Sequence, residues 1–301
     1  MNGARLILSL LLVALPAAAL PAVRRTRRPR AWALVLAASL GAGFVLFEAS
    51  LIHASLPLGF TLLGLERLAA ACRSLGGHLF GDPTAFGAFA GLLAIVIGGQ
   101  AIRGVVGTLR ANSTLRREAA ARVATPVGGH SAVFLPMRTR WAVALPGDTP
   151  QVVLSSDLAG KLERHELKAV VRHEVAHLEH HHVRFLLLGA AVNSGMWFLP
   201  WRARANNALR LALERWADEL ASARSGEARA DVSSAVRKLA SLAPSALAAY
   251  RIRALEGPRD NKPGREWAWP TAASATVPLA IGLAVTLVLH LSQVISVAGG
   301  G

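Results

Sequence analysis

The stretch RHELKAVVRHEVAHLEHHH, residues 164–182, decides how the rest of the sequence is interpreted, because it predicts one helix that carries the motif HEVAH. His173 and His177 are four residues apart, so on a helix they project from one face, one turn apart. Two imidazoles placed in this way can hold one zinc ion. Glu174 lies beside them and can take a proton from the attacking water and pass it to a leaving amine.

The residues that flank the motif decide between a zinc helix and a chance match on a charged helix surface. They are apolar, as a buried active-site helix requires: Val170, Val171, Val175, Ala176 and Leu178. The sequence therefore predicts a buried helix that binds zinc, provided that a third ligand exists.

Composition indicates a membrane protein. The hydrophobic fraction is 53%, and 33 basic residues against 18 acidic ones give a formal charge of +15. A basic excess can point to nucleic acid or to a membrane. Here the arginines flank long apolar runs, so we expect a lipid bilayer as partner and no nucleic acid. Cys72 is the only cysteine, which excludes a disulfide framework and a thiolate metal cluster.

Four apolar runs are long enough to cross a bilayer, and we expect about four transmembrane helices: 6–23, 31–54, 84–108 and 272–297. The first run could instead be a cleaved signal peptide. The arginines that directly follow it favour an uncleaved span that ends in the cytoplasm.

The basic residues after the third run place the following region on the cytoplasmic side of a bacterial inner membrane. We therefore divide the chain into a membrane region with three transmembrane helices (1–108), a cytoplasmic zinc metallopeptidase domain (109–270) and a C-terminal transmembrane helix (271–301).

Three short runs before the HEVAH helix are rich in β-formers and are separated by Pro, Gly and Asp: 131–137, 141–147 and 151–156. They predict a small antiparallel sheet. Ser156 or Asp157 could cap the short turn that follows.

A catalytic zinc site needs three protein ligands and an open position. Glu214, in LALERWADELA (211–221), is the better candidate for the third ligand, and Asp218 lies one turn later on the same face. Such a carboxylate can orient a metal-bound histidine through its other nitrogen. The alternative is a salt-bridged surface helix. Val183 stands where a metzincin would supply its third histidine, which excludes that class.

His180, His181 and His182 are more typical of a solvated or interfacial helix end than of ligands, with an accessory role as the alternative. Residues 183–200 are apolar again. Since Glu214 must lie on the same side of the membrane as the HEVAH helix, we expect the segment 185–200 to be a core helix or a dip into the inner leaflet, not a crossing.

HEVAH followed by ERWAD (214–218) resembles the gluzincin peptidases, which combine HExxH with ExxxD. The sequence is most similar to the BlaR/MecR-type membrane zinc metallopeptidases, in a short actinobacterial-like form without a sensor domain. WAVALPG followed by QVVLSSDL resembles the strand-turn-strand that precedes the HExxH helix there. The resemblance implies a mostly α membrane protein with a cytoplasmic α+β zincin-like metallopeptidase domain and a small antiparallel sheet.

The resemblance also implies roles for individual residues. His173, His177 and Glu214 would bind Zn²⁺, Glu174 would be the general base and acid, and Asp218 would orient a ligand.

A substrate would add as a strand beside the sheet, with 141–147 as the candidate edge. Two departures from the family pattern matter. Because the sequence ends at Gly301, we expect no external penicillin-binding domain. Residues 250–252 lack the His-Pro pair that often precedes the Arg-Ile segment. Arg251 or Tyr250 could stabilise the oxyanion or be an ordinary anchoring residue near the membrane.

These expectations describe a multi-pass, zinc-dependent metalloendopeptidase that hydrolyses a protein or peptide substrate, in a regulatory signalling role. One alternative is a membrane-protein quality-control protease of HtpX-like type. Proteins of that type place membrane helices between HExxH and the distal glutamate, and the 36 residues available here leave little room for them. The other alternative is a non-catalytic zinc-binding membrane scaffold, against which the intact Glu174 argues.

Overall fold

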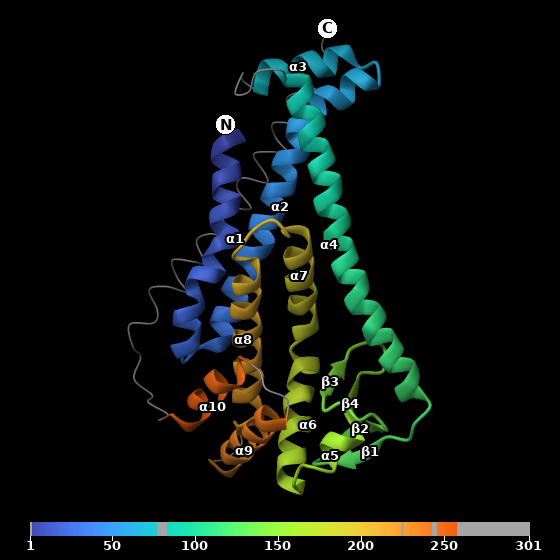
Figure 1. Cartoon of the computed structure of the whole chain (residues 1–301), viewed down its shortest axis with the longest axis vertical. Helices are drawn as coiled ribbons and strands as arrows, with labels where there is room; N and C mark the ends of the chain where they lie inside the picture. The colour runs from blue at the N-terminus through green and yellow to red at the C-terminus, as the bar shows by residue number, and fades with distance from the viewer. Residues whose placement is uncertain (1, 77–82, 224–225, 243–245, 258–301) are drawn as a thin grey trace.

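The computed structural model describes residues 2–76, 83–223, 226–242 and 246–257 (Figure 1). Within these ranges the chain is mostly helical and carries one small sheet, which confirms the predicted fold class. The predicted last span, 272–297, lies outside the described residues.

Among the described residues, three helices are long and apolar enough to cross a bilayer: α1 (Asn2–Arg25), α2 (Pro29–Leu62) and α4 (Pro83–Ala120). They contain the first three predicted spans. Pro29 occupies the first turn of α2, where its missing N–H costs no hydrogen bond and its fixed φ favours the helix. A short helix, α3 (Glu66–Gly76), follows α2.

Two further helices, α7 (His182–Gly195) and α8 (Arg202–Ala221), form a hairpin that runs up and back beside the long helices (Figure 1). α7 packs against α4, and α8 packs against α1 and α2. At the tip of the hairpin, the ring of Phe198 lies 5.9 Å from that of Phe47 in α2. The chain thus returns to the level of the HEVAH helix, as the position of Glu214 requires.

The sheet has the order β1-β2-β4-β3, built from β1 (Thr125–Val127), β2 (His130–Leu135), β3 (Ala142–Leu145) and β4 (Gln151–Ser155). β2 and β4 are parallel and the other two pairs are antiparallel. The prediction of a wholly antiparallel sheet is therefore wrong for one pair. After β2 the chain moves out to the edge as β3 and returns between the two as β4, and these two reversals leave β4 parallel to β2.

The residues of β4 alternate between two buried faces of the sheet. Val152 and Leu154 pack with the hydrophobic residues of α6, while Val153 packs with the C-terminal part of α4. This burial on both faces explains the unbroken apolar run in the sequence. The short helix α5 (Ser156–Ala159) follows, and its N-cap is Ser155, one residue before the predicted candidates.

The HEVAH helix, α6 (Arg164–Glu179), begins with a capping box between Glu163 and Glu166. The Glu166 carboxylate also accepts hydrogen bonds from Ser234 Oγ (2.6 Å) and Lys238 Nζ (2.8 Å), both in α9 (Gly226–Leu242). One buried side chain therefore both starts the helix and attaches it to α9. The last described helix is α10 (Ala248–Glu256).

The predicted helix 164–182 is too long by three residues. α6 ends at Glu179, and His181 has a left-handed backbone with φ 53°. A left-handed residue cannot continue a right-handed helix. The next helix therefore starts afresh at His182.

Arg215 connects α8 to the turn between α1 and α2. Its side chain is buried, and Nη1 donates to the Val23 carbonyl oxygen (2.7 Å) while Nη2 donates to that of Thr26. Those carbonyls close the C-terminal end of α1, where helical partners are lacking. The α1–α2 hairpin is thereby attached to the helix that carries Glu214.

We predict that Arg215→Met lowers the free energy of unfolding by about 2–4 kcal/mol, because it removes charge-assisted hydrogen bonds and leaves two buried carbonyls without donors. Unfolding of the full chain in detergent micelles measures this. Arg210→Met, at an exposed position of the same helix, should change it by less than about 0.5 kcal/mol. Equal effects of the two substitutions would contradict the prediction.

Candidate metal centre

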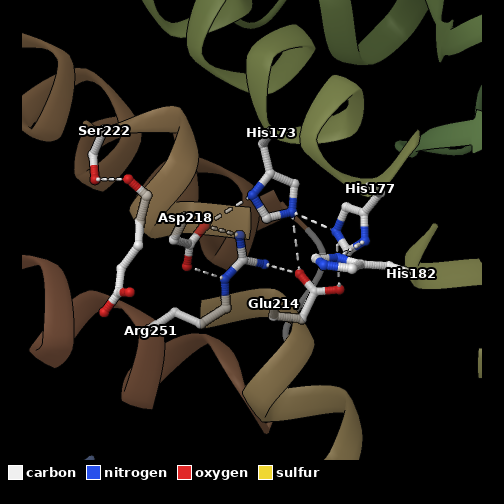
Figure 2. A network of polar contacts seen from close by, with 8 residues as sticks. His173, His177, His182, Glu214, Asp218, Ser222 and Arg251 are labelled. Atoms are coloured by element: carbon white, nitrogen blue, oxygen red, sulfur yellow. Dashed lines mark hydrogen bonds and ion pairs between the residues drawn. The ribbon is translucent and has the colours of Figure 1, made fainter. Parts of the chain in front are cut away.

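The two histidines of HEVAH lie on the face of α6 that is turned towards α8, and both are buried. Their Nε2 atoms are 3.1 Å apart (Figure 2). The one-turn spacing read from the sequence therefore places two ring nitrogens at a single point.

Glu214 reaches the same point from α8. Its Oε2 lies 3.3 Å from Nε2 of His173, and its Oε1 lies 3.8 Å from Nε2 of His177. One ligand atom from each of the three residues lies within 4.8 Å of the others. Two helices far apart in the sequence thus supply a compact set of two imidazoles and one carboxylate (Figure 2).

This set fits a zinc ion in both chemistry and size. Two histidines and one glutamate are a ligand set of catalytic zinc sites, with ligand distances of about 2.0–2.2 Å. Tetrahedral geometry at such distances separates ligand atoms by roughly 3.3–3.6 Å. The Nε2 atoms are 3.1 Å apart, and the nearest Glu214 oxygen lies 3.3 Å from that of His173 (Oε2) and 3.8 Å from that of His177 (Oε1), all close to that separation.

Asp218 and Arg251 support the set from behind. Asp218 Oδ1 lies 2.9 Å from Nδ1 of His173. Arg251, from α10, donates through Nε and Nη2 to the Asp218 carboxylate (2.8 and 2.6 Å) and pairs through Nη1 with Glu214 Oε2 (2.7 Å). The predicted position of Asp218 beside a histidine agrees with this geometry.

The charges of this cluster favour a cation at the three ligand atoms. Burial by itself would raise the pKa of Asp218, but Arg251 and hydrogen bonds from His173 and Arg251 outweigh it and hold that pKa at about 2. The same balance keeps the pKa of Glu214 well below its usual range. Burial and the nearby Arg251 lower the pKa of His173, yet hydrogen bonds to the two carboxylates raise it to about 9.

Glu174 differs from these carboxylates, because burial raises its pKa to about 7. The backbone N–H of Ala144, in β3, donates to it and partly offsets this rise. The side chain lines the same pocket as His173 and Glu214. The site therefore contains one carboxylate with a raised affinity for a proton beside two that stay ionised, a contrast typical of acid–base sites.

The sequence leaves Arg251 as either an oxyanion stabiliser or an ordinary anchoring residue. In the structure its Nε, Nη1 and Nη2 all engage carboxylates of the site, so it acts as a counter-charge. The guanidinium of Arg24 lies over the ring of Tyr250, with its Cζ 4.3 Å from the ring centroid. No sequence pattern indicated the contact of Arg251 with Glu214 and Asp218, because those residues lie more than thirty positions upstream.

The expectation for the histidines after the motif is wrong for His182. Its side chain is fully buried, not solvated, and its Nδ1 lies 3.0 Å from Nδ1 of His177 (Figure 2). The left-handed residue His181 turns the chain so that the ring faces back towards α6. A helix that ran on to His182 would not allow this contact.

A pocket opens beside the metal-ligand set. His173, Glu174, Glu214, Asp218 and Arg251 form its polar side. Its other wall is apolar and comes from β3, α6 and α9: Ala142, Ala169, Val170, Val232, Ala235, Val236 and Leu239. A reactive polar group and an apolar wall in one pocket are typical of a small-molecule or peptide site.

Comparison with known proteins agrees with this geometry. Residues 141–257 match the family model of Peptidase family M48. The matched stretch includes β3, HEVAH, Glu214 and Arg251, and it supports a peptidase of the M48 metallopeptidase family. No curated protein and no solved structure matches the chain. The finer likeness to BlaR/MecR-type peptidases stays a prediction.

We predict that Glu214→Gln removes bound zinc from the purified protein, because a neutral amide replaces the charged ligand and leaves Arg251 without one of its partners. Zinc per protein chain, measured by elemental analysis, should fall from about one to near zero. Glu219→Gln, an exposed position on the same helix, is the matched control and should keep its zinc. Full zinc in the Glu214 variant would contradict the ligand assignment.

Proposed function

We propose that this protein is an integral membrane zinc-dependent endopeptidase that cleaves a protein substrate. The observation that carries the proposal is the convergence of His173, His177 and Glu214 on one point. This point lies beside a pocket that is lined by Glu174 and by Ala142 of the edge strand β3. The match to a peptidase family supports the proposal independently.

Each residue of the site has a role in peptide hydrolysis. His173, His177 and Glu214 would hold the zinc ion, which, when bound, lowers the pKa of water and polarises a carbonyl group. Glu174, with its raised pKa, takes the proton of the attacking water and gives it to the leaving amine. Asp218 holds Nδ1 of His173, and Arg251 balances the charge of the two carboxylates.

The free edge of β3 supports substrate binding as an added strand. Ser155 N–H donates to the Trp141 carbonyl oxygen (3.0 Å), so Val143 and Leu145 also bond towards β4. The N–H and C=O groups of Ala142 and Ala144 then point away from the sheet. They face the HEVAH helix, because β3 lies against α6. The Ala144 N–H donates to Glu174, so an extended peptide that pairs with the other groups of this edge runs past Glu174.

The apolar wall of the pocket supports a preference for substrates with an apolar side chain near the cleaved bond. Leu239 and Val236 of α9 line the same pocket as the polar site. A charged or amide side chain there would lose its hydration without gaining a partner.

We further propose that the zinc domain lies on the cytoplasmic side of a bacterial inner membrane. The cluster Arg24–Arg30 between α1 and α2, and the basic residues in the last turns of α4, lie on the side of the long helices that carries the sheet (Figure 1). Basic residues concentrate at cytoplasmic ends of spans. The domain limits 109–270 belong to the same proposal, and the matched stretch 141–257 falls within them.

The likeness to BlaR/MecR-type peptidases favours a regulatory role, in which the substrate is a repressor or another regulator. A quality-control role on membrane proteins is the second candidate, and the packing of the α7–α8 hairpin among the long helices favours it. A zinc-binding scaffold has less support, because a structural site does not need Glu174.

We predict that Glu174→Gln lowers kcat by about 10²- to 10⁴-fold without loss of zinc, because it removes the proton acceptor and leaves the ligands in place. Cleavage of casein or self-cleavage, measured with zinc content on the same samples, tests this. Glu179→Gln, on the exposed side of the same helix, should keep full activity. Zinc in both variants and in wild type, with activity in none, would favour the scaffold instead.

We also predict that Leu239→Ala shifts specificity towards larger apolar side chains, because it enlarges the apolar end of the pocket. The ratio of kcat/KM for phenylalanine over alanine in a peptide series should rise by about tenfold, since methylene-sized differences are worth 10- to 200-fold. Leu242→Ala, on the same helix but outside the pocket lining, should leave that ratio unchanged. An unchanged ratio in the Leu239 variant would contradict a role of the apolar wall in substrate recognition.

A further inference from the structure

His182 is the first residue of α7, and its whole side chain is buried behind the metal-ligand set. Its Nδ1 lies 3.0 Å from Nδ1 of His177. The ring of Trp216, from α8, packs on it at a centroid distance of 4.4 Å. The imidazole is thus held between two helices, and one of its nitrogens meets the far side of a ligand ring (Figure 2).

His182 does not belong to the ligand set itself. The nitrogen of His177 that faces His173 and Glu214 is Nε2, whereas His182 meets Nδ1. The two nitrogens of an imidazole point in different directions, so a cation held at Nε2 lies on the other side of the ring from His182. A role for His182 must therefore act through His177.

The chemistry of a ligand histidine assigns the proton between the two rings. A histidine that binds a metal through Nε2 carries its proton on Nδ1 and donates it to an acceptor. The atom within reach of that proton is Nδ1 of His182. By this assignment His182 is the acceptor, and its own proton is on Nε2.

We propose that His182 is a positioning residue for the metal centre, whose Nδ1 accepts the Nδ1–H of His177 and thereby fixes the tautomer and the orientation of that ligand. This inference rests on the proposed zinc site. The two ligand histidines would then use different acceptors, a carboxylate (Asp218) for His173 and a neutral imidazole for His177. Trp216 keeps the accepting ring in place, and Arg30, from the start of α2, lies over Trp216 at 5.5 Å.

Two substitutions of similar size and polarity separate this role from simple packing. In His182→Asn, the amide oxygen can stand where Nδ1 stands now and still accept from His177. In His182→Gln, the amide lies further out, in the place of Nε2, and the acceptor is lost. His182→Leu removes the acceptor with no polar replacement.

The experiment measures the dissociation constant of Zn²⁺ for each full-length variant in detergent, by competition with a chelator, and the melting temperature of each metal-free protein. We expect the Gln and Leu variants to bind zinc about 10- to 100-fold more weakly than wild type, as for other partners of metal-binding histidines. The dissociation constant of the Asn variant should stay within about threefold of the wild-type value. The metal-free melting temperatures of Asn and Gln should agree.

Equal affinities of wild type and the Gln variant would overturn the role of His182. Equal weakening in Asn and Gln would overturn it as well, because packing would then explain the loss. If wild type itself binds no zinc, the proposed function fails first, so the two failures are distinguishable.

Discussion

The contact of Arg251 with Glu214 and Asp218 is the interaction on which the site depends. It places two carboxylates of α8 against one guanidinium of α10, with Asp218 buried and Glu214 half-buried. Carboxylates removed from water need a partner, and loss of that partner is strongly destabilising. The same contact positions both carboxylates. Asp218 Oδ1 lies near Nδ1 of His173, and the Glu214 carboxylate lies near the point where the Nε2 atoms of His173 and His177 meet.

The left-handed residue His181 has two consequences at once. It ends the HEVAH helix, and it starts α7 in a direction that carries the chain along the long helices and back as α8. That return is what brings Glu214 to the site, and it also places His182 behind His177. The positions of Glu214 and His182 at the candidate metal centre therefore both depend on the path of the α7–α8 hairpin.

α8 connects two of the helices that are long and apolar enough to cross a bilayer with the candidate metal centre. On one side it carries Glu214 and Asp218, and on the other it packs against α1 and α2 and binds their connecting turn through Arg215. α4 likewise runs from an apolar stretch beside α7 down to the face of the sheet. α8 therefore links the α1–α2 hairpin directly to Glu214 and Asp218.

By itself, the sequence determined what depends on local spacing. HEVAH placed two imidazoles one turn apart, Glu214 and Asp218 fell on one face of one helix, and long apolar runs indicated three of the helices, because helical periodicity and bilayer thickness are local constraints. Only the tertiary structure decided the parallel pairing of β2 with β4, the end of α6 at His181, and the contacts of Arg251 and His182. These depend on how distant segments meet, and a spacing pattern within one segment contains no information on that meeting.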